Sequence, residues 1–291
     1  MKPFPFDYIA PTSIAEAVAL LTSEPDARIL AGGQSLVPMM NLHLAQPAVL
    51  VDLNGVTSLN YVAERAGGLA VGALTRQRSL ERAPQVRQRW PVLTEALAYV
   101  GHPAIRVRGT IGGSLAHADP AAELPMLALL LDATLTVQSA QGERTIAARD
   151  FFIGALTTAL NPGEILTEIW FPALPAQTGW GFQEVARRFG DFALAAAATT
   201  LRLDDQNRCS EARIALAGVG ATPVRAPRSE ALLHGAAIST GLLQEVARTI
   251  ATEIEPESDL HASAAYRRQA AGVLTVRALH QAWQRAEQAI G

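Results

Sequence analysis

The chain has 291 residues, of which 49% are hydrophobic and 18% charged, with 17 prolines and a formal net charge of −3. This composition is typical of a globular protein with a sizeable core, and it excludes intrinsic disorder, collagen and coiled coil. Positive charge is not collected into a long basic run, so DNA and RNA are poor candidate ligands.

Cysteine and histidine usage restricts the chemistry further. The single cysteine, Cys209, excludes an internal disulfide framework, a cysteine-rich zinc module and an iron–sulfur cluster held by this chain alone. The six histidines are scattered without a pair at metal-ligand spacing, and we expect no metal site. The first residues have no apolar signal-peptide core, and the apolar run 124–131 is too short to span a bilayer. We expect a cytoplasmic protein without a transmembrane segment.

The first fifty residues alternate helix and strand. Ser13 and Glu16 have the spacing of a capping box, and the apolar residues after them predict a helix that ends near Pro25. Apolar runs at 28–31 and 48–53 predict two strands joined through a loop or short helix. We interpret residues 1–56 as a small βαβ-like lobe.

The next segment, 57–176, is predicted to form a second lobe. Strands are expected at 68–72, 134–137, 144–146 and 168–171, and helices are expected to begin at residues 79, 91 and 125. Gly142 lies between two of these strands as a hairpin turn would. The segment 172–181 contains two prolines and two glycines with few charges, which is typical of a linker.

Residues 177–291 read as strands followed by helices. Strands are predicted at 180–187, 193–203 and 212–219, and helices at 242–254 and 264–289. The alanine-rich run 193–198 would also fit a helix on propensity alone. A third, α+β domain is therefore expected.

Two short segments each carry a glycine pair followed by a hydroxyl residue, namely Ala31-Gly32-Gly33-Gln34-Ser35 and Thr110-Ile111-Gly112-Gly113-Ser114. Glycine pairs permit positive φ and let successive N–H groups converge on an anion. Two such loops in separate lobes, neither with a lysine, fit a diphosphate and hence a dinucleotide. A single glycine pair is more often only a turn, and neither the P-loop nor the Rossmann glycine pattern occurs in its proper context.

With the first glycine segment, the stretch from Gly101-His102-Pro103 to Glu123-Leu124-Pro125 resembles the FAD-binding medium subunit of molybdenum hydroxylases, of the carbon monoxide dehydrogenase type. The similarity extends along essentially the whole chain. The resemblance implies an α+β fold in which N-terminal and central α/β lobes sandwich FAD, the PCMH-type FAD-binding fold. A C-terminal lobe with a three-stranded antiparallel sheet and helices would follow.

The resemblance also implies a set of cofactor-binding residues. The diphosphate would be wrapped on one side by Ala31, Gly32, Gly33, Gln34, Ser35 and Leu36, and on the other by Thr110, Gly112, Gly113 and Ser114. Glu123 matches an acidic FAD-binding position, expected on the ribose or adenine side, and Leu160 matches an apolar position against the cofactor. Gln183 stands where xanthine dehydrogenases carry a flavin-contacting lysine. No acid, base or nucleophile is expected, since the cofactor performs the redox chemistry.

The implied function is that of an oxidoreductase subunit carrying FAD. A large molybdopterin-binding subunit would hydroxylate a substrate, and two [2Fe–2S] clusters of a small subunit would pass the electrons to FAD in this chain and on to an external acceptor. A dimer of heterotrimers is expected. The substrate (carbon monoxide, an aldehyde, a purine or another N-heterocycle) and the acceptor stay open. The arginines of 264–289, namely Arg267, Arg268, Arg277 and Arg285, would form either a solvated face or a docking surface for partner subunits.

Two alternatives belong to other classes. Gly112-Gly113-Ser114-Leu115-Ala116 departs by one residue from G-x-S-x-G, so a serine hydrolase using Ser114 is one alternative, although a nucleophile elbow should follow a buried apolar strand. The other is a non-catalytic scaffold subunit that has lost its flavin.

Overall fold

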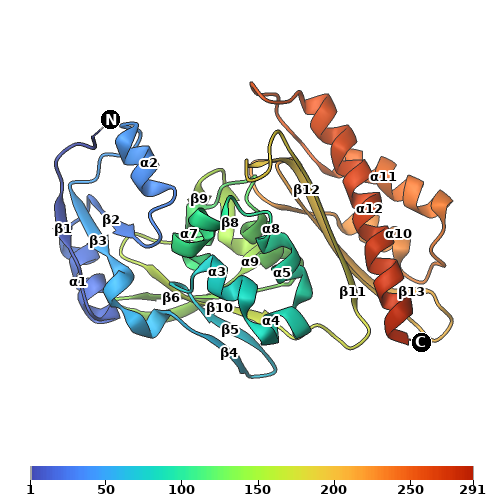
Figure 1. Ribbon diagram of the computed structural model, residues 1–291, viewed down its shortest axis with the longest axis horizontal. Helices are drawn as coiled ribbons and strands as arrows, with labels where there is room; N and C mark the ends of the chain where they lie inside the picture. Colours follow the sequence, from blue (N-terminus) through green and yellow to red (C-terminus); the bar gives the residue numbers. More distant parts are fainter. Residues whose placement is uncertain (1, 291) are drawn as a thin grey trace.

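The computed structural model describes residues 2–290. These residues form three lobes that follow one another along the longest axis, from the N-terminal lobe (blue) to the C-terminal lobe (orange and red) (Figure 1). Each lobe contains a main sheet of its own. The predicted α+β class is confirmed.

The N-terminal lobe is built on a three-stranded parallel sheet with strand order β1-β3-β2. Its elements are β1 (Asp7–Ile9), α1 (Ile14–Ser23), β2 (Ala27–Leu30), α2 (Leu36–Asn41), β3 (Val49–Asp52) and the 3-10 turns η1 (Leu53–Gly55) and η2 (Thr57–Leu59). The predicted helix and both predicted strands are present. Strand β1 escapes prediction because it has three residues, all exposed, and so shows no alternation of buried and exposed positions.

The N-terminus of α1 is capped as the sequence predicts, with one difference. Ser13 Oγ accepts a hydrogen bond from the Glu16 backbone N–H at 3.2 Å. The Glu16 carboxylate accepts from the backbone N–H of Thr12 at 2.8 Å, one residue before the cap. The carboxylate therefore satisfies a donor just outside the helix.

The mutation Ser13→Ala is expected to lower the free energy of unfolding by about 1 kcal/mol, because the Glu16 N–H loses its acceptor. Urea denaturation of the full chain measures this change. Ser23→Ala is the matched control, since the Ser23 hydroxyl only donates to a carbonyl of its own helix. An equal loss in both variants would contradict the capping role of Ser13.

The central lobe contains a five-stranded antiparallel sheet of order β4-β5-β10-β6-β7. Its strands are β4 (Val62–Arg65), β5 (Gly68–Gly72), β6 (Thr134–Ser139), β7 (Gly142–Ala147) and β10 (Ile165–Pro172). The predicted hairpin around Gly142 is β6–β7, and Gly142 has a φ of 123°, a value that favours glycine. A small sheet of β8 (Phe152–Gly154) and β9 (Thr157–Thr158) lies beside it.

Short helices pack on one side of this sheet. They are α3 (Gln77–Arg82), α4 (Pro84–Arg89), α5 (Pro91–Leu97), α6 (Pro103–Arg108), α7 (Ile111–His117), α8 (Glu123–Leu130) and α9 (Ala148–Phe151). Three of them begin with proline, which fits the first helical position because it lacks an N–H that would be unpaired there. Fully buried side chains such as Trp90, Leu93, Ile111 and Leu127 form the core between these helices and the sheet.

The C-terminal lobe has an antiparallel sheet of order β11-β12-β13-β14 and three helices. Its elements are β11 (Gly179–Ala186), β12 (Ala193–Leu203), β13 (Cys209–Ala217), β14 (Val224–Arg225), α10 (Pro227–Leu233), α11 (Thr240–Glu253) and α12 (Ala264–Ile290). The three predicted strands are present, and the two-residue β14 extends the sheet. The alanine-rich run lies in β12, so the helical alternative is wrong.

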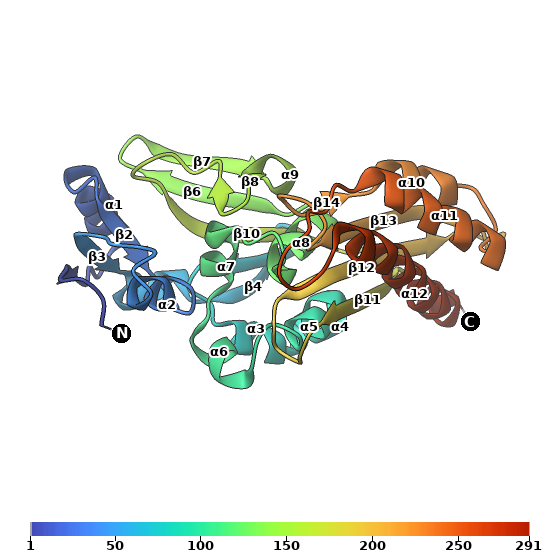
Figure 2. The same ribbon diagram turned by 90° about the horizontal axis from the view of Figure 1, so that it is seen from above.

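Both faces of this sheet are covered, which explains the small residues of β12. Ala196 and Ala198 belong to the core shared with the central lobe, whereas Ala195 and Ala197 face the core under α12. Helix α12 crosses β11 and β12, and α10 lies beside β13 (Figure 2). Burial on both faces selects compact apolar side chains here, and this tertiary packing overrides helix propensity.

The sequence predicted a solvated or docking face for the four arginines of α12, but two of them form contacts within the fold. Arg267 is buried, and its guanidinium donates to the carbonyls of Leu194 (2.7 Å) and Gly218 (3.0 Å). Arg285 donates to Glu95 at 2.8 Å and stacks over the ring of Trp180. These two arginines hold α12 to the sheet. Arg277 is exposed and Arg268 half-buried.

Residues 2–290 contain neither a membrane-spanning helix nor a cluster of metal ligands. No helix in that range is long and apolar enough to cross a membrane. Nor do three His, Cys, Asp or Glu side chains gather there in a group that could hold a metal ion. Cys209 is buried without a disulfide partner.

Candidate functional site

A cavity of about 830 Å³ opens where the N-terminal and central lobes meet, and the loop between β11 and β12 also reaches it. This volume lies in the upper part of the range of roughly 300–1,000 Å³ typical of small-molecule sites. Every residue that the sequence assigned to the cofactor site lines the cavity: Ala31, Gly32, Gly33, Gln34, Ser35, Leu36, Thr110, Gly112, Gly113, Ser114, Glu123 and Leu160. The fold thus brings all of these residues to one place.

The first glycine segment connects β2 to α2 and has unused backbone donors. Gly33 has a φ of +72°, which lets the chain turn sharply before α2. Among residues 2–290, no backbone acceptor is recorded for the N–H groups of Gly33, Gln34, Ser35 or Leu36. Gln34 Nε2 donates to the carbonyl of Gly32 at 3.0 Å and braces the turn. Four consecutive free N–H groups in the wall of a cavity form a site suited to an anion.

The second glycine segment is the first turn of helix α7, and its prediction as a loop is wrong. Thr110 is the N-cap, and its Oγ1 accepts from the Gly113 N–H at 3.0 Å. The N–H groups of Ile111 and Gly112 donate to the carbonyls of Thr75 (3.0 Å) and Ala73 (2.9 Å). The expected nest of free amides is therefore absent from this side, because the protein itself uses those donors. The Ser114 hydroxyl and the small volume of Gly113 remain available to a ligand.

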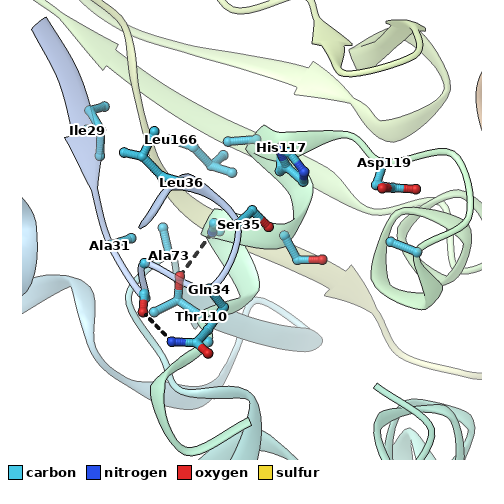
Figure 3. A pocket seen from close by; sticks show the side chains of 18 of the residues that line it. Ile29, Ala31, Gln34, Ser35, Leu36, Ala73, Thr110, His117, Asp119 and Leu166 are labelled. Atoms are coloured by element: carbon cyan, nitrogen blue, oxygen red, sulfur yellow. Dashed lines mark hydrogen bonds between the residues drawn. The ribbon is translucent and has the colours of Figure 1, made fainter. Parts of the chain in front are cut away.

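The glycines of both segments permit close contacts, between the lobes at Gly32 and within the central lobe at Gly112. A Cβ on Gly32 would lie 2.6 Å from the carbonyl oxygen of Arg108, at the end of α6. A Cβ on Gly112 would lie 2.5 Å from Ala73 Cβ. Figure 3 shows Gln34 and Ser35 of the first segment over the same part of the cavity as Thr110.

Two carboxylates in the cavity wall have opposite environments. Burial raises the pKa of the Glu123 carboxyl to about 7, and its own backbone N–H opposes this rise. Hydrogen bonds from Arg144, each 2.7 Å long, lower the pKa of Glu164 to about 2. At neutral pH, Glu164 is therefore ionised and paired, whereas Glu123 is near the midpoint of its titration.

The C-terminal lobe also contributes to the cavity, through Gly190, Asp191 and Phe192. From the family resemblance, Asp191 and Phe192 fit either a place near the flavin or the start of a strand, and they are not among the predicted site residues. Phe192 is 60% exposed, so its ring is accessible to a ligand in the cavity. Ile29 and Leu166 add apolar surface from β2 and β10. Pattern alone gave no signal for these positions, because they come together only in the tertiary fold.

Gln183, which stands at the position of the flavin-contacting lysine of xanthine dehydrogenases, does not line the cavity. Cross-strand partners point to the same face of a sheet, and successive residues alternate. Gln183 is opposite Ala197, which faces α12, whereas Glu184 is opposite Ala196, which faces the central lobe. Glu184 is therefore on the central-lobe face of β11, and it does not line the cavity either.

The surroundings of Ser114 exclude the serine hydrolase alternative. Helix α6 and Gly109 precede the segment, whereas a nucleophile elbow follows a buried strand. Among the described residues, no histidine is hydrogen-bonded to the Ser114 hydroxyl. The hydrogen-bonded pair of nucleophile and base that a hydrolase requires is thus absent from residues 2–290.

Two family models cover almost the entire chain. The model described as "FAD binding domain in molybdopterin dehydrogenase" matches residues 4–174. The chain belongs to this family. The model described as "CO dehydrogenase flavoprotein C-terminal domain" matches residues 180–282. FAD is therefore the cofactor of this chain, and the chain is a flavoprotein oxidoreductase subunit.

Similar proteins extend over the same length. The chain is 42% identical to the 6-hydroxypseudooxynicotine dehydrogenase complex subunit alpha of Paenarthrobacter nicotinovorans, across 98% of this chain and 97% of the relative. It is 38% identical to the carbon monoxide dehydrogenase medium chain of Hydrogenophaga pseudoflava, across 98% and 99%. A solved structure of quinoline 2-oxidoreductase from Pseudomonas putida 86 matches with a TM-score of 0.94 at 41% identity, across 98% and 99%. This FAD-binding chain is thus similar to medium subunits of molybdenum hydroxylases.

Proposed function

We propose that this chain holds FAD between its two glycine segments and transfers electrons from [2Fe–2S] clusters of a small partner subunit to an external acceptor. A large molybdopterin-binding subunit would complete a heterotrimer. The observation that carries the proposal is the convergence of the two segments on one cavity, where Gly33, Gln34, Ser35 and Leu36 have free N–H groups. Bound FAD supplies the one- and two-electron chemistry, and the protein binds and orients it.

The residues of the cavity fit a dinucleotide in distinct ways. The free N–H groups of residues 33–36 would receive the diphosphate, with the Ser114 hydroxyl as a further donor. Leu160, Leu166 and Ile29 provide apolar surface for the rings. Phe192 lies on the side of the C-terminal lobe and would shield the cofactor from water.

The proposal includes partner chains because this chain has too few cysteines to hold a [2Fe–2S] cluster. A [2Fe–2S] cluster is held by several cysteine thiolates, whereas Cys209 is the single cysteine of the sequence and is fully buried. The similar proteins are themselves named as a complex subunit and a medium chain. We propose a dimer of heterotrimers, with the three lobes of residues 1–56, 57–176 and 177–291 in each medium subunit.

The first test is the visible absorption spectrum of the purified chain before and after addition of FAD and removal of the excess. The same measurement is made on the chain co-expressed with its neighbouring genes, so that partner subunits are present during FAD binding. Retained bands of oxidised flavin are the expected result. Absence of flavin in both preparations would overturn the assignment and would favour a scaffold subunit without flavin.

A further inference from the structure

Arg76 is joined to the second glycine segment through its backbone. It is the N-cap residue of α3, is half-buried, and does not line the cavity. Its backbone pairs with that of Thr110, the N-cap of α7, in an isolated antiparallel bridge. Beside this bridge, the Ile111 N–H donates to the carbonyl of Thr75 at 3.0 Å. The position of Arg76 is therefore fixed relative to the second segment.

The side chain of Arg76 reaches the N-terminal lobe. One guanidinium nitrogen donates to Asn54 Oδ1 at 2.6 Å, and another donates to the carbonyl oxygen of Arg108 at the end of α6. Gly32 packs on that same carbonyl oxygen, since a Cβ on Gly32 would lie 2.6 Å from it. A guanidinium presents its donors in a rigid, planar fork. One side chain thus contacts both sides of the junction between the two lobes.

Asn54 continues this contact to the first glycine segment. Its Nδ2 donates to the carbonyl oxygen of Ala31 at 2.9 Å, directly before the glycine pair. Asn54 is itself held by Asp52, the N-cap of η1, whose carboxylate accepts from the Asn54 backbone N–H at 2.9 Å. Because a peptide unit is planar, a fixed Ala31 carbonyl also fixes the direction in which the chain enters residues 33–36. A continuous path of contacts therefore joins Arg76 to the first segment.

We propose that Arg76 and Asn54 are positioning residues that hold the two glycine segments at the separation at which both can contact the diphosphate of FAD. The inference rests on the proposed function, because it requires FAD in this cavity. A site that is already ordered binds more tightly than a mobile one, since less conformational freedom is lost on binding. Without the contact between Arg76 and Asn54, the separation of the segments varies, and FAD has to order them.

The first experiment measures the dissociation constant of FAD by fluorescence titration, with the full chain or with the co-expressed complex, whichever retains FAD. Arg76→Gln and Asn54→Ala are each expected to weaken binding by about tenfold, the effect of about one hydrogen bond to a charged group. The double variant is also expected to lose about tenfold and not about 100-fold, because both residues act through one contact. Arg76→Lys should recover part of the loss, since an ammonium can donate to one of the two acceptors.

The matched control for the loss of a positive charge is Arg78→Gln. Arg78 is paired with Glu81 of its own helix at 2.8 Å, so its replacement leaves the contact between Arg76 and Asn54 intact and should leave the affinity for FAD unchanged. A loss in Arg76→Gln without a loss in Asn54→Ala would assign the effect to charge alone and overturn the inference. Losses that multiply in the double variant would overturn it as well.

The second experiment separates positioning from general stability. The phosphorus NMR resonances of FAD bound at saturation report the surroundings of its diphosphate. They are expected to shift in Arg76→Gln and Asn54→Ala and to stay in place in Arg78→Gln. A purely structural role would lower the urea midpoint of the variants and leave both these resonances and the FAD affinity of the folded chain unchanged, which would contradict the inference.

The unchanged chain distinguishes the two possible failures. If it binds no FAD in either preparation, the proposed function fails, and the inference fails with it. If it binds FAD and all variants bind with equal affinity, the positioning role alone is wrong. Asn54 is exposed, so Asn54→Ala still tests the contact if Arg76→Gln does not fold.

Discussion

Replacement of Gly113 by valine is expected to abolish retention of FAD while the chain stays folded. A Cβ at this position would lie 2.7 Å from Thr110 Oγ1 and 3.8 Å from Ala31 Cβ. The branched side chain would therefore displace the capping threonine and fill the space between the two glycine segments. We expect the affinity for FAD to fall by at least about 100-fold, which corresponds to about 2.7 kcal/mol. The ratio of bound flavin to protein after desalting measures this loss.

The matched control is Gly241→Val, near the start of α11, where a Cβ would meet no atom within 4 Å. This variant should retain FAD as the unchanged chain does. The far-ultraviolet circular dichroism of both variants shows whether the fold persists. Normal flavin content in Gly113→Val would mean that the cofactor lies elsewhere, whereas an unfolded Gly113→Val would require Gly113→Ala as the smaller probe.

Replacement of Gly181 by valine is expected to have the largest effect on stability. Gly181 lies in β11 under α12, and a Cβ there would lie 2.0 Å from the carbonyl oxygen of Ala278. The obstructing atom belongs to the backbone of α12, which packs on the sheet through Ala278 and Ala282, both fully buried. A change of side-chain rotamer therefore does not relieve the clash. We expect a loss of at least about 3 kcal/mol in the free energy of unfolding, at the upper end of overpacking effects.

Urea denaturation measures this loss, and Gly154→Val in β8 provides the control within a strand. A Cβ on Gly154 would lie 3.7 Å from Thr157 Cβ, which is an ordinary contact. The control is expected to change the free energy of unfolding by no more than about 1 kcal/mol. Similar losses in the two variants would show that α12 can move away from β11 at low cost.

The sequence predicted those helices and strands that are long enough to show a period or that carry a cap or turn residue at the right position. The cap at Ser13, the hairpin at Gly142 and the alternation along β11 all correspond to what the chain forms. Strands β1 and β14 have three and two residues, too few for a period to be recognised. The run 193–198 fits helix or strand equally by composition, and only its burial between α12 and the central lobe decides the outcome.

The family resemblance predicted most residues of the candidate site. Local sequence patterns predicted less, because they do not show which distant segments meet in the fold. All predicted cofactor residues line the cavity, yet the glycine pair at 112–113 lies in the first turn of α7, which Thr110 caps. Gln183 lies on the face of β11 that packs against α12, opposite to Trp180, Phe182 and Glu184, and a family position alone does not reveal this. Asp191 and Phe192 reach the cavity through tertiary folding alone.

The two glycine segments look equivalent in sequence, yet their backbone N–H groups have different partners in the structure. Residues 33–36 offer free N–H groups, whereas the N–H groups of residues 111–113 are consumed within the protein. The first segment therefore offers backbone donors to a ligand, whereas in the second segment the lack of a Cβ on Gly112 allows close packing against Ala73 within the central lobe. Exchanging the two sequences would preserve the glycine count and destroy both roles.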